Sequence, residues 1–361
     1  MNSMKKRFRF LWGSTILGQV IIGGVGHIDE AAVEPEPALR LSSDIEKSLR
    51  FYFEHYDMVR HHVLKPGEKI VISLDGERLC RFCGKGEPAV SFRNLAHAIP
   101  ESLGNKALST TYECDTCNKE FGEGIETHLG HWSKPMRYIA RIKGKKRFPQ
   151  LEESGGKGWK MEYDPKSGFQ IKSYEDDPVA TVNGEARQLG LTIRRKPYIP
   201  LAVLKAFWKM AVTLMPEDEL ENFKDVRRWI MTKTHESIGG PIQVFVGFHP
   251  GPMPPGFLGV ALLMRRSADT RYPYAFIAIR YGNETFQVPV PSALNDAQGT
   301  SDPIPFFRFP DLVDPNVYGK SKFFQVDLSS IDPMSDPVNV TFQAETVDST
   351  QHEPTSENRY G

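Results

Sequence analysis

Four cysteines are the residues of this 361-residue chain whose type and spacing most clearly imply chemistry. They form two C-x-x-C pairs, Cys80 with Cys83 and Cys114 with Cys117, and the chain has no other cysteine. Each C-x-x-C turn can present two thiolates to one ion, and two turns complete the tetrahedral ligand set that Zn²⁺ prefers. A redox role would require a thioredoxin-like βαβ context, which the flanking sequence lacks. The spacing therefore predicts a closed, structural zinc site. The bound ion would stabilise a segment that is too short to build a hydrophobic core of its own.

The segment between the two pairs carries a second candidate site. It contains His97 in the phrase Ala-His-Ala-Ile-Pro, and Asn118 directly follows the last cysteine. This order resembles the HNH endonucleases, in which a ββα-metal motif is braced by a four-cysteine zinc site; the phrases that carry the resemblance are CRFCG, AHAIPESLGN and ECDTCNKEF. The resemblance covers Cys80 to about Leu129 and implies hydrolysis of phosphodiester bonds in DNA.

The resemblance implies a catalytic role for each of these two residues. His97 matches the general base of the family, and an imidazole titrates near neutrality, as the deprotonation of water requires. Asn118 matches a position that binds the catalytic cation, and an amide oxygen suits Mg²⁺ or Mn²⁺. Such a cation would neutralise charge on the phosphate and on the departing oxygen.

The chain departs from the family pattern directly before the base. The family commonly has an acidic metal ligand there, whereas this chain has Ala96. We expect Glu126 to supply the missing ligand, because it would lie two helical turns from Asn118. His128 and Glu101 are the alternatives, in that order.

The asparagine that the family usually has before the third cysteine is also absent. Ser109 and Thr110 occupy that place, and Asn105 is the candidate substitute. The same residues also have a purely structural interpretation, in which His97 is a buried histidine hydrogen-bonded within the zinc loop and Asn118 caps a helix. The sequence therefore leaves open a catalytically inactive, zinc-stabilised module that binds nucleic acid or protein.

Charge is concentrated around the cysteines, although the chain as a whole has 45 basic and 45 acidic residues. Residues 78–148 contain 13 Lys and Arg against seven acids, which is typical of a surface that faces phosphate. The run 134–147 contains no acid, and we expect it to contact the DNA backbone; a solvated surface is the alternative. The predicted contacts are Arg137, Arg141, Lys143, Lys145 and Lys146.

The rest of the chain predicts a mixed α+β protein with more than one compact unit. Apolar residues make up 40% and charged residues 25%, which is typical of a soluble globular protein. A helical pattern opens at Ser43 and continues to Val59. We expect this helix to pack against the segment that carries the four cysteines (Cys80 to about Leu129), which we call the cysteine module. The stretch 200–234 predicts two helices broken at Met215–Pro216, and strands are expected from residue 241 onward.

These patterns divide the chain into four segments. An amino-terminal extension and linker (1–41) precedes the HNH module with its treble-clef-like zinc site (42–150). A strand-rich mixed α+β domain (151–349) is expected to recognise substrate, a regulatory partner or a second copy of the chain. A loose polar tail (350–361) ends the sequence.

The amino terminus superficially resembles a secretory signal, since basic residues precede the uncharged stretch FLWGSTILGQVIIGGVG. Polar residues and several glycines interrupt this stretch, which is also short and polar for a membrane span. We therefore favour a strand or an extension, no membrane partner, and a reducing cytoplasmic location that suits paired thiols. Analogy with the family suggests bacterial antiviral defence against foreign DNA, with RNA as an alternative substrate.

Overall fold

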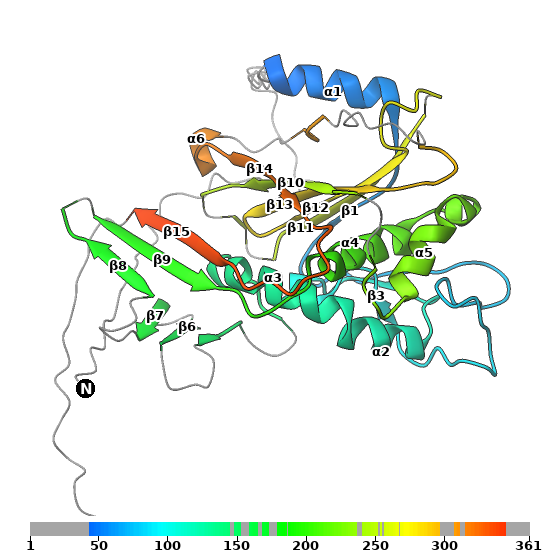
Figure 1. Ribbon diagram of the computed structural model, residues 1–361, viewed down its shortest axis with the longest axis horizontal. Coiled ribbons are helices and arrows are strands. Elements are labelled where there is room, and N and C mark those ends of the chain that lie inside the picture. The colour runs from blue at the N-terminus through cyan, green and yellow to red at the C-terminus, as the bar shows by residue number, and fades with distance from the viewer. Residues whose placement is uncertain are drawn as a thin grey trace, which may run out of the picture.

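The computed structural model describes the central part of the chain. Both the expected amino-terminal extension (1–41) and the tail (350–361) lie outside the described residues. Residues 43–343 are described apart from internal gaps at 145–147, 153–158, 165–167, 173–178, 186, 237–239, 252, 255, 267, 297–306 and 311–314. Helices and strands are both abundant, which confirms the predicted α+β class (Figure 1).

A six-stranded antiparallel sheet is the largest element of the fold. The mostly apolar segments after position 241 supply five of its six strands, as the sequence predicted. The sheet has an inner face, on which Ile277 and Ile279 join the main core, and an outer face, on which Phe276 and Ala278 form a smaller cluster. In spatial order its strands are β1 (Tyr56–Leu64), β11 (Leu258–Arg265), β12 (Ala275–Tyr281), β13 (Glu284–Val290), β10 (Gln243–Phe248) and β14 (Lys322–Asp327).

Helix α4 (Pro200–Leu214) lies beneath the inner face of this sheet, and every one of its residues is buried (Figure 1). Its sequence, PLAVLKAFWKMAVTL, is apolar apart from Lys205, Lys209 and Thr213, which is typical of a central core helix. The proline at its first position suits a helix start, and Pro216 prevents its continuation. The predicted break at Met215–Pro216 is thus confirmed, and η2 (Glu217–Phe223) and α5 (Lys224–Met231) follow.

The cysteine module packs against the other side of α4. Strands β3 (Ala96–His97) and β4 (Leu108–Thr110) form an antiparallel pair, and β2 (Ile70–Ile72) joins β4 in parallel. Helix α2 (Asp115–Glu123) begins directly after Cys114, and α3 (Ile125–Ile139) follows it. Together β3, β4 and α2 make the predicted ββα motif, with the short 3₁₀ helix η1 (Glu101–Leu103) between the two strands.

Two small antiparallel sheets complete the fold beside the end of α3, where Met136 and Tyr138 contribute to their shared core. In one of them β6 pairs antiparallel with β7. Among the described residues no helix is both long and apolar enough to cross a bilayer. The remaining elements are β5 (Leu151–Glu152), β6 (Lys160–Asp164), β7 (Gly168–Lys172), β8 (Ala180–Asn183), β9 (Gln188–Arg194), β15 (Pro337–Gln343) and α6 (Pro315–Tyr318).

Helix α1 (Ser43–His55) differs from the prediction in its end and in its packing partner. It stops at His55 because the next nine residues pair with β11 as strand β1, so hydrogen bonding to a sheet edge overrides the helical pattern. Its Tyr52 packs against Phe276 and Phe309 on the outer face of the large sheet. The expected packing of this helix against the cysteine module was therefore wrong.

Candidate active site

The four cysteine sulfurs converge as the spacing predicted. Their Sγ atoms all lie within 4.8 Å of one another, and none forms a disulfide. The backbone amide of Cys114 donates to Cys80 Sγ at 3.4 Å, and that of Cys117 donates to Cys114 Sγ at 3.5 Å. Four convergent thiols, three of them buried, fit the closed ligand set of a structural Zn²⁺. A bound zinc ion would cross-link the loop before β3 to the start of α2.

His97 lies on β3 opposite Ser109 of β4, with 38% of its side chain exposed. Its Nε2 is 4.0 Å from Glu101 Oε2, while its Nδ1 is buried and has no hydrogen-bond partner among the described residues. Burial lowers the pKa of His97, and the nearby Glu101 carboxylate opposes this shift. The imidazole is therefore neutral at physiological pH, which is the state that a general base requires.

Asp115 holds the loop that precedes β3 in place. The sequence did not predict this role. Its carboxylate accepts hydrogen bonds from the Ser91 hydroxyl at 2.6 Å and from the backbone amides of Arg93 and Asn94 at 2.9 and 3.1 Å. These bonds hold its pKa well below the usual range. Because Asp115 starts α2, the loop that leads to His97 is tied to the second cysteine pair.

Asn105 holds the connection between β3 and β4. Its fully buried amide donates to the carbonyls of Ile99 and Leu108, both at 2.7 Å, and accepts from the backbone amides of Ala107 and Leu108. This set satisfies the side chain, so Asn105 acts through the backbone of the ββ turn. The structure thus gives the candidate substitute for the missing family asparagine a positioning role.

A buried lysine on α4 connects the cysteine module to the large sheet. Lys209 is fully buried, and its Nζ lies 3.1 Å from Glu113 Oε2 and 3.3 Å from Glu126 Oε1. The same ammonium donates to the His97 carbonyl at 3.2 Å. Burial alone would lower the pKa of Lys209, but the two carboxylates raise it above its ordinary value. Lys209 therefore holds together the strand of the candidate base, the start of α2 and the start of α3.

Glu113 and Glu126 are the acids of this network. Burial raises the pKa of Glu113 to about 7, and Lys209 opposes the shift. Glu126, the predicted metal ligand, is committed to Lys209 through one carboxylate oxygen. Sequence analysis missed Lys209 because its partners are distant in the chain; the available signal was a lysine inside an otherwise apolar helix.

Two further residues of the module bind the carboxyl end of α4. The Arg81 guanidinium donates to the carbonyls of Val212, Thr213 and Met215 at 3.0, 2.9 and 2.7 Å. The Tyr112 hydroxyl donates to the Thr213 carbonyl at 2.7 Å, and its ring stacks under Arg81. A cation at a helix carboxyl end satisfies the unpaired carbonyls and the helix dipole. The zinc loops therefore cap α4 as well as support β3.

Asn118 and His128 lie on the two helices that follow the second cysteine pair. The backbone amide of the half-buried Asn118 donates to the Cys114 carbonyl at 2.9 Å, and its side chain has no hydrogen-bond partner among the described residues. His128 Nδ1 accepts from the Ile199 amide at 3.1 Å, and burial lowers its pKa. Asn118 is thus a side chain that could take an additional ligand, while His128 joins α3 to the start of α4.

The predicted phosphate contacts are placed very differently from one another. Arg137 is buried and donates to Ser133 Oγ and to the carbonyls of Ser102 and Gly130, all at 2.9–3.0 Å. This arrangement disfavours a DNA contact, because each of the three guanidinium nitrogens of Arg137 already donates a hydrogen bond within the protein. Lys143 is exposed, and Arg141 is half-buried with its guanidinium over the Tyr163 ring. Lys145 and Lys146 lie outside the described residues.

Comparison with known families supports the nuclease interpretation. Residues 80–132 match the family model described as HNH endonuclease. This match confirms the resemblance, and it covers the four cysteines, His97, Asn118 and Glu126. No curated protein and no solved structure matches the chain. An HNH domain implies a nuclease-type function with a nucleic acid as substrate.

Proposed function

We propose that this protein is a divalent-metal-dependent HNH endonuclease that hydrolyses phosphodiester bonds in DNA, with His97 as the general base. The observation that supports this most strongly is the His97 side chain itself. It is part exposed, its pKa is lowered by burial, and it lies on the β-pair of a ββα motif inside the matched segment. Its Nδ1 has no hydrogen-bond partner among the described residues.

In this proposal His97 takes a proton from the attacking water. Glu101, 4.0 Å from Nε2, would stabilise the imidazolium that forms, in keeping with its opposition to the lowered pKa. Lys209 would keep β3 in place through the His97 carbonyl, and Asp115 would do so through the preceding loop. General-base catalysis of this kind contributes about 10²- to 10⁴-fold in rate.

Asn118 is the proposed ligand of the catalytic Mg²⁺ or Mn²⁺, together with a carboxylate. Its amide is not held by another described side chain, and amide and carboxylate oxygens suit these hard cations. Glu126 is the expected partner, and Lys209 holds only its Oε1; Glu101, whose Oε2 lies beside His97, is the alternative to replace the acid absent at Ala96. When bound, the cation would neutralise charge on the phosphate and on the leaving oxygen.

Cations after α3 would hold the DNA backbone. Lys143 and Arg141 are the described candidates, and Lys145 and Lys146 remain predictions from the sequence. A cytoplasmic defence role against foreign DNA likewise rests on family analogy.

A catalytically inactive nucleic-acid-binding module is the second candidate. Ala96 favours it, and so does the absence, among the described residues, of any His, Cys, Asp or Glu cluster for an ion besides the four cysteines.

Nicking of supercoiled plasmid with Mg²⁺ or Mn²⁺ separates the two candidates. We expect His97→Ala to abolish nicking with unchanged zinc content. His131→Ala is the matched control, since among the described residues that ring in the same module binds only the Pro197 carbonyl. Salt-dependent DNA binding without nicking by the unmodified protein would support the inactive module instead. Loss of nicking in both variants would show general damage to the module.

A further inference from the structure

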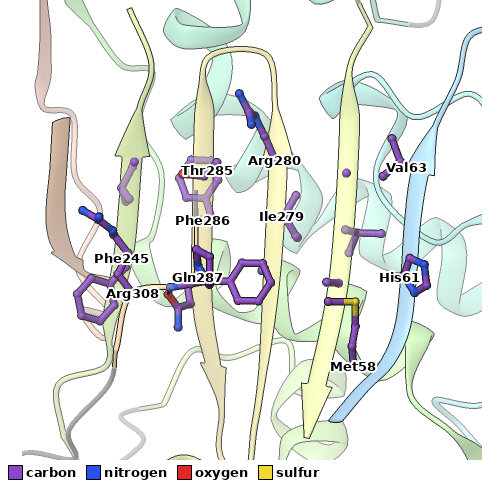
Figure 2. Close-up of a pocket in the computed structure, with 18 of the residues that line it drawn as sticks. Met58, His61, Val63, Phe245, Ile279, Arg280, Thr285, Phe286, Gln287 and Arg308 are labelled. Atoms are coloured by element: carbon purple, nitrogen blue, oxygen red, sulfur yellow. Dashed lines mark hydrogen bonds between the residues drawn. The ribbon is translucent and has the colours of Figure 1, made fainter. Parts of the chain in front are cut away.

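The outer face of the six-stranded sheet contains a hollow of about 370 Å³ (Figure 2). It lies on the side away from α4 and the cysteine module, whose helices are seen behind the sheet in Figure 2. Its size falls within the roughly 300–1,000 Å³ that small-molecule sites occupy. The hollow is separate from the residues proposed to cleave DNA, so its role is independent of that proposal.

Small residues at the centre of two cross-strand rows create the hollow. Where the middle strands carry Ala261, Ala278 and Gly259, no bulky side chain covers the backbone, while the larger side chains of His61 and Phe245 rise at the two ends of the first row. One row consists of His61, Ala261, Ala278, Gln287 and Phe245, and the next of Val63, Gly259, Arg280, Thr285 and Gly247. The register of the sheet therefore builds a concave apolar floor with polar groups at its edge.

The charged groups of the hollow are all basic. Arg280 lies over the Phe257 ring at 5.1 Å, and Arg308 lies over the Phe323 ring at 3.7 Å. His61 adds an imidazole at the β1 side, and the lining residues within the described part of the chain include no Asp or Glu. Guanidinium groups held on aromatic rings are oriented in advance to bind a carboxylate or a phosphate.

The wall that carries Arg308 is fixed by Gln287. Its amide nitrogen donates to the Phe307 carbonyl at 2.9 Å, and its amide oxygen accepts from the Phe309 backbone at 2.7 Å. Tyr52 of α1 binds the same amide at 2.8 Å. The hollow is therefore formed before any ligand arrives, which lowers the entropic cost of binding.

We propose that this hollow binds a small amphipathic organic anion. Its flat apolar body would lie on the floor around Ala278, and its carboxylate or phosphate would meet Arg280 and Arg308. Charge complementarity supports this occupant over a neutral molecule, because two guanidinium groups border an apolar surface and the described residues that line it include no acid. The ligand class is thus defined by one negative group on an aromatic or aliphatic body.

The test uses the full chain and a pair of fluorescent probes that differ in charge. We expect the anion 8-anilinonaphthalene-1-sulfonate to bind saturably, and its neutral analogue N-phenyl-1-naphthylamine to bind at least tenfold more weakly. Replacing Arg280 and Arg308 together by Gln should abolish this difference by weakening the anion alone. Phe53→Ser, which removes an exposed apolar side chain of α1 outside the hollow, is the matched control and should change neither affinity.

Two variants that fill the hollow test its location. Ala278→Phe and Gly259→Val should each weaken binding of the anion at least tenfold. A Cβ at Gly259 would meet only the Phe257 ring at 3.9 Å, so this variant is expected to fold, as an unchanged thermal midpoint would show. Unchanged anion binding in both folded variants would overturn the proposal.

Competition and oligomeric state complete the test. Displacement of the probe by laurate would identify a carboxylate ligand, and displacement by 1-naphthyl phosphate a phosphate ligand; displacement by neither would overturn the proposal. Light scattering must show that Ala278→Phe leaves the molar mass unchanged. A dimer that this variant dissociates would mean that a second copy of the chain covers the hollow.

Discussion

Replacing Lys209 by methionine is the strongest perturbation that the structure offers. The substitution keeps the buried side-chain volume but removes a cation that two carboxylates and the His97 carbonyl share. At separations of 3.1 and 3.3 Å, an effective dielectric constant of about 20 gives each ion pair an attraction of about 5 kcal/mol. Desolvation offsets much of this, and removal of one partner from a buried pair typically costs about 3–5 kcal/mol.

We therefore expect Lys209→Met to lower the free energy of unfolding by about 3–5 kcal/mol, measured by urea denaturation at neutral pH. The double variant Lys209→Met with Glu113→Gln should recover at least half of this loss. Only Glu126 would then lack a partner, and its side chain is partly exposed and can be solvated. Plasmid nicking by Lys209→Met should fall even under conditions where the variant is folded, because β3 loses its tie to α4.

Lys205→Met is the matched control on the same helix. Lys205 is also buried, but its ammonium binds the carbonyls of Thr232 and Thr234 rather than a carboxylate. We expect this variant to lose about 1–3 kcal/mol and to keep its nicking rate. Equal losses in the two lysine variants, or no recovery in the double variant, would refute the reasoning about the network.

Four other perturbations test separate parts of the molecule. Cys117→Ser should lose the zinc ion and lower the thermal midpoint; a full zinc content on metal analysis would refute the ligand set. Arg81→Met should lower the urea midpoint by the equivalent of about 2 kcal/mol, because three carbonyls at the end of α4 lose their donor. Burial raises the pKa of Glu284 to about 7 from 4.5, so its ionisation destabilises the folded state as pH rises through that interval. Glu284→Gln should consequently gain about 3 kcal/mol at pH 8 and almost nothing at pH 4.5, and an equal gain at both pH values would contradict the assignment. The lowered pKa of His97 predicts that nicking declines only at pH values below 6.5, and a decline that begins well above 6.5 would argue against this base.

Local patterns predicted the parts of the site that depend on neighbours in sequence. The C-x-x-C spacing sufficed for the sulfur cluster, because each turn places two thiolates side by side whatever surrounds it. Short, mostly apolar segments likewise identified five of the six strands of the large sheet, those after residue 241. Both signals act over a few residues, so tertiary structure had little opportunity to override them.

Long-range partners could not be predicted in the same way. The apolar face of α1 indicated burial but not against which surface, and it packs on the outer sheet face. Arg137 belonged to a basic run, yet it follows Ser133 by one helical turn and faces the core with Trp132 and Met136. Helical periodicity was the signal that would have separated Arg137 from the exposed Lys143.

The position of α4 limits how this protein can be divided. One side of the helix supports the large sheet, where Trp208 Nε1 donates to the Pro289 carbonyl, and the other side supplies Lys209 to the matched HNH segment. A fragment that ended before residue 200 would keep every cysteine and the proposed base, but it would expose the apolar surface that α4 covers and leave Glu113 without its cation. The matched segment is consequently part of a larger folding unit. We expect a fragment that contains this segment without α4 not to keep its fold.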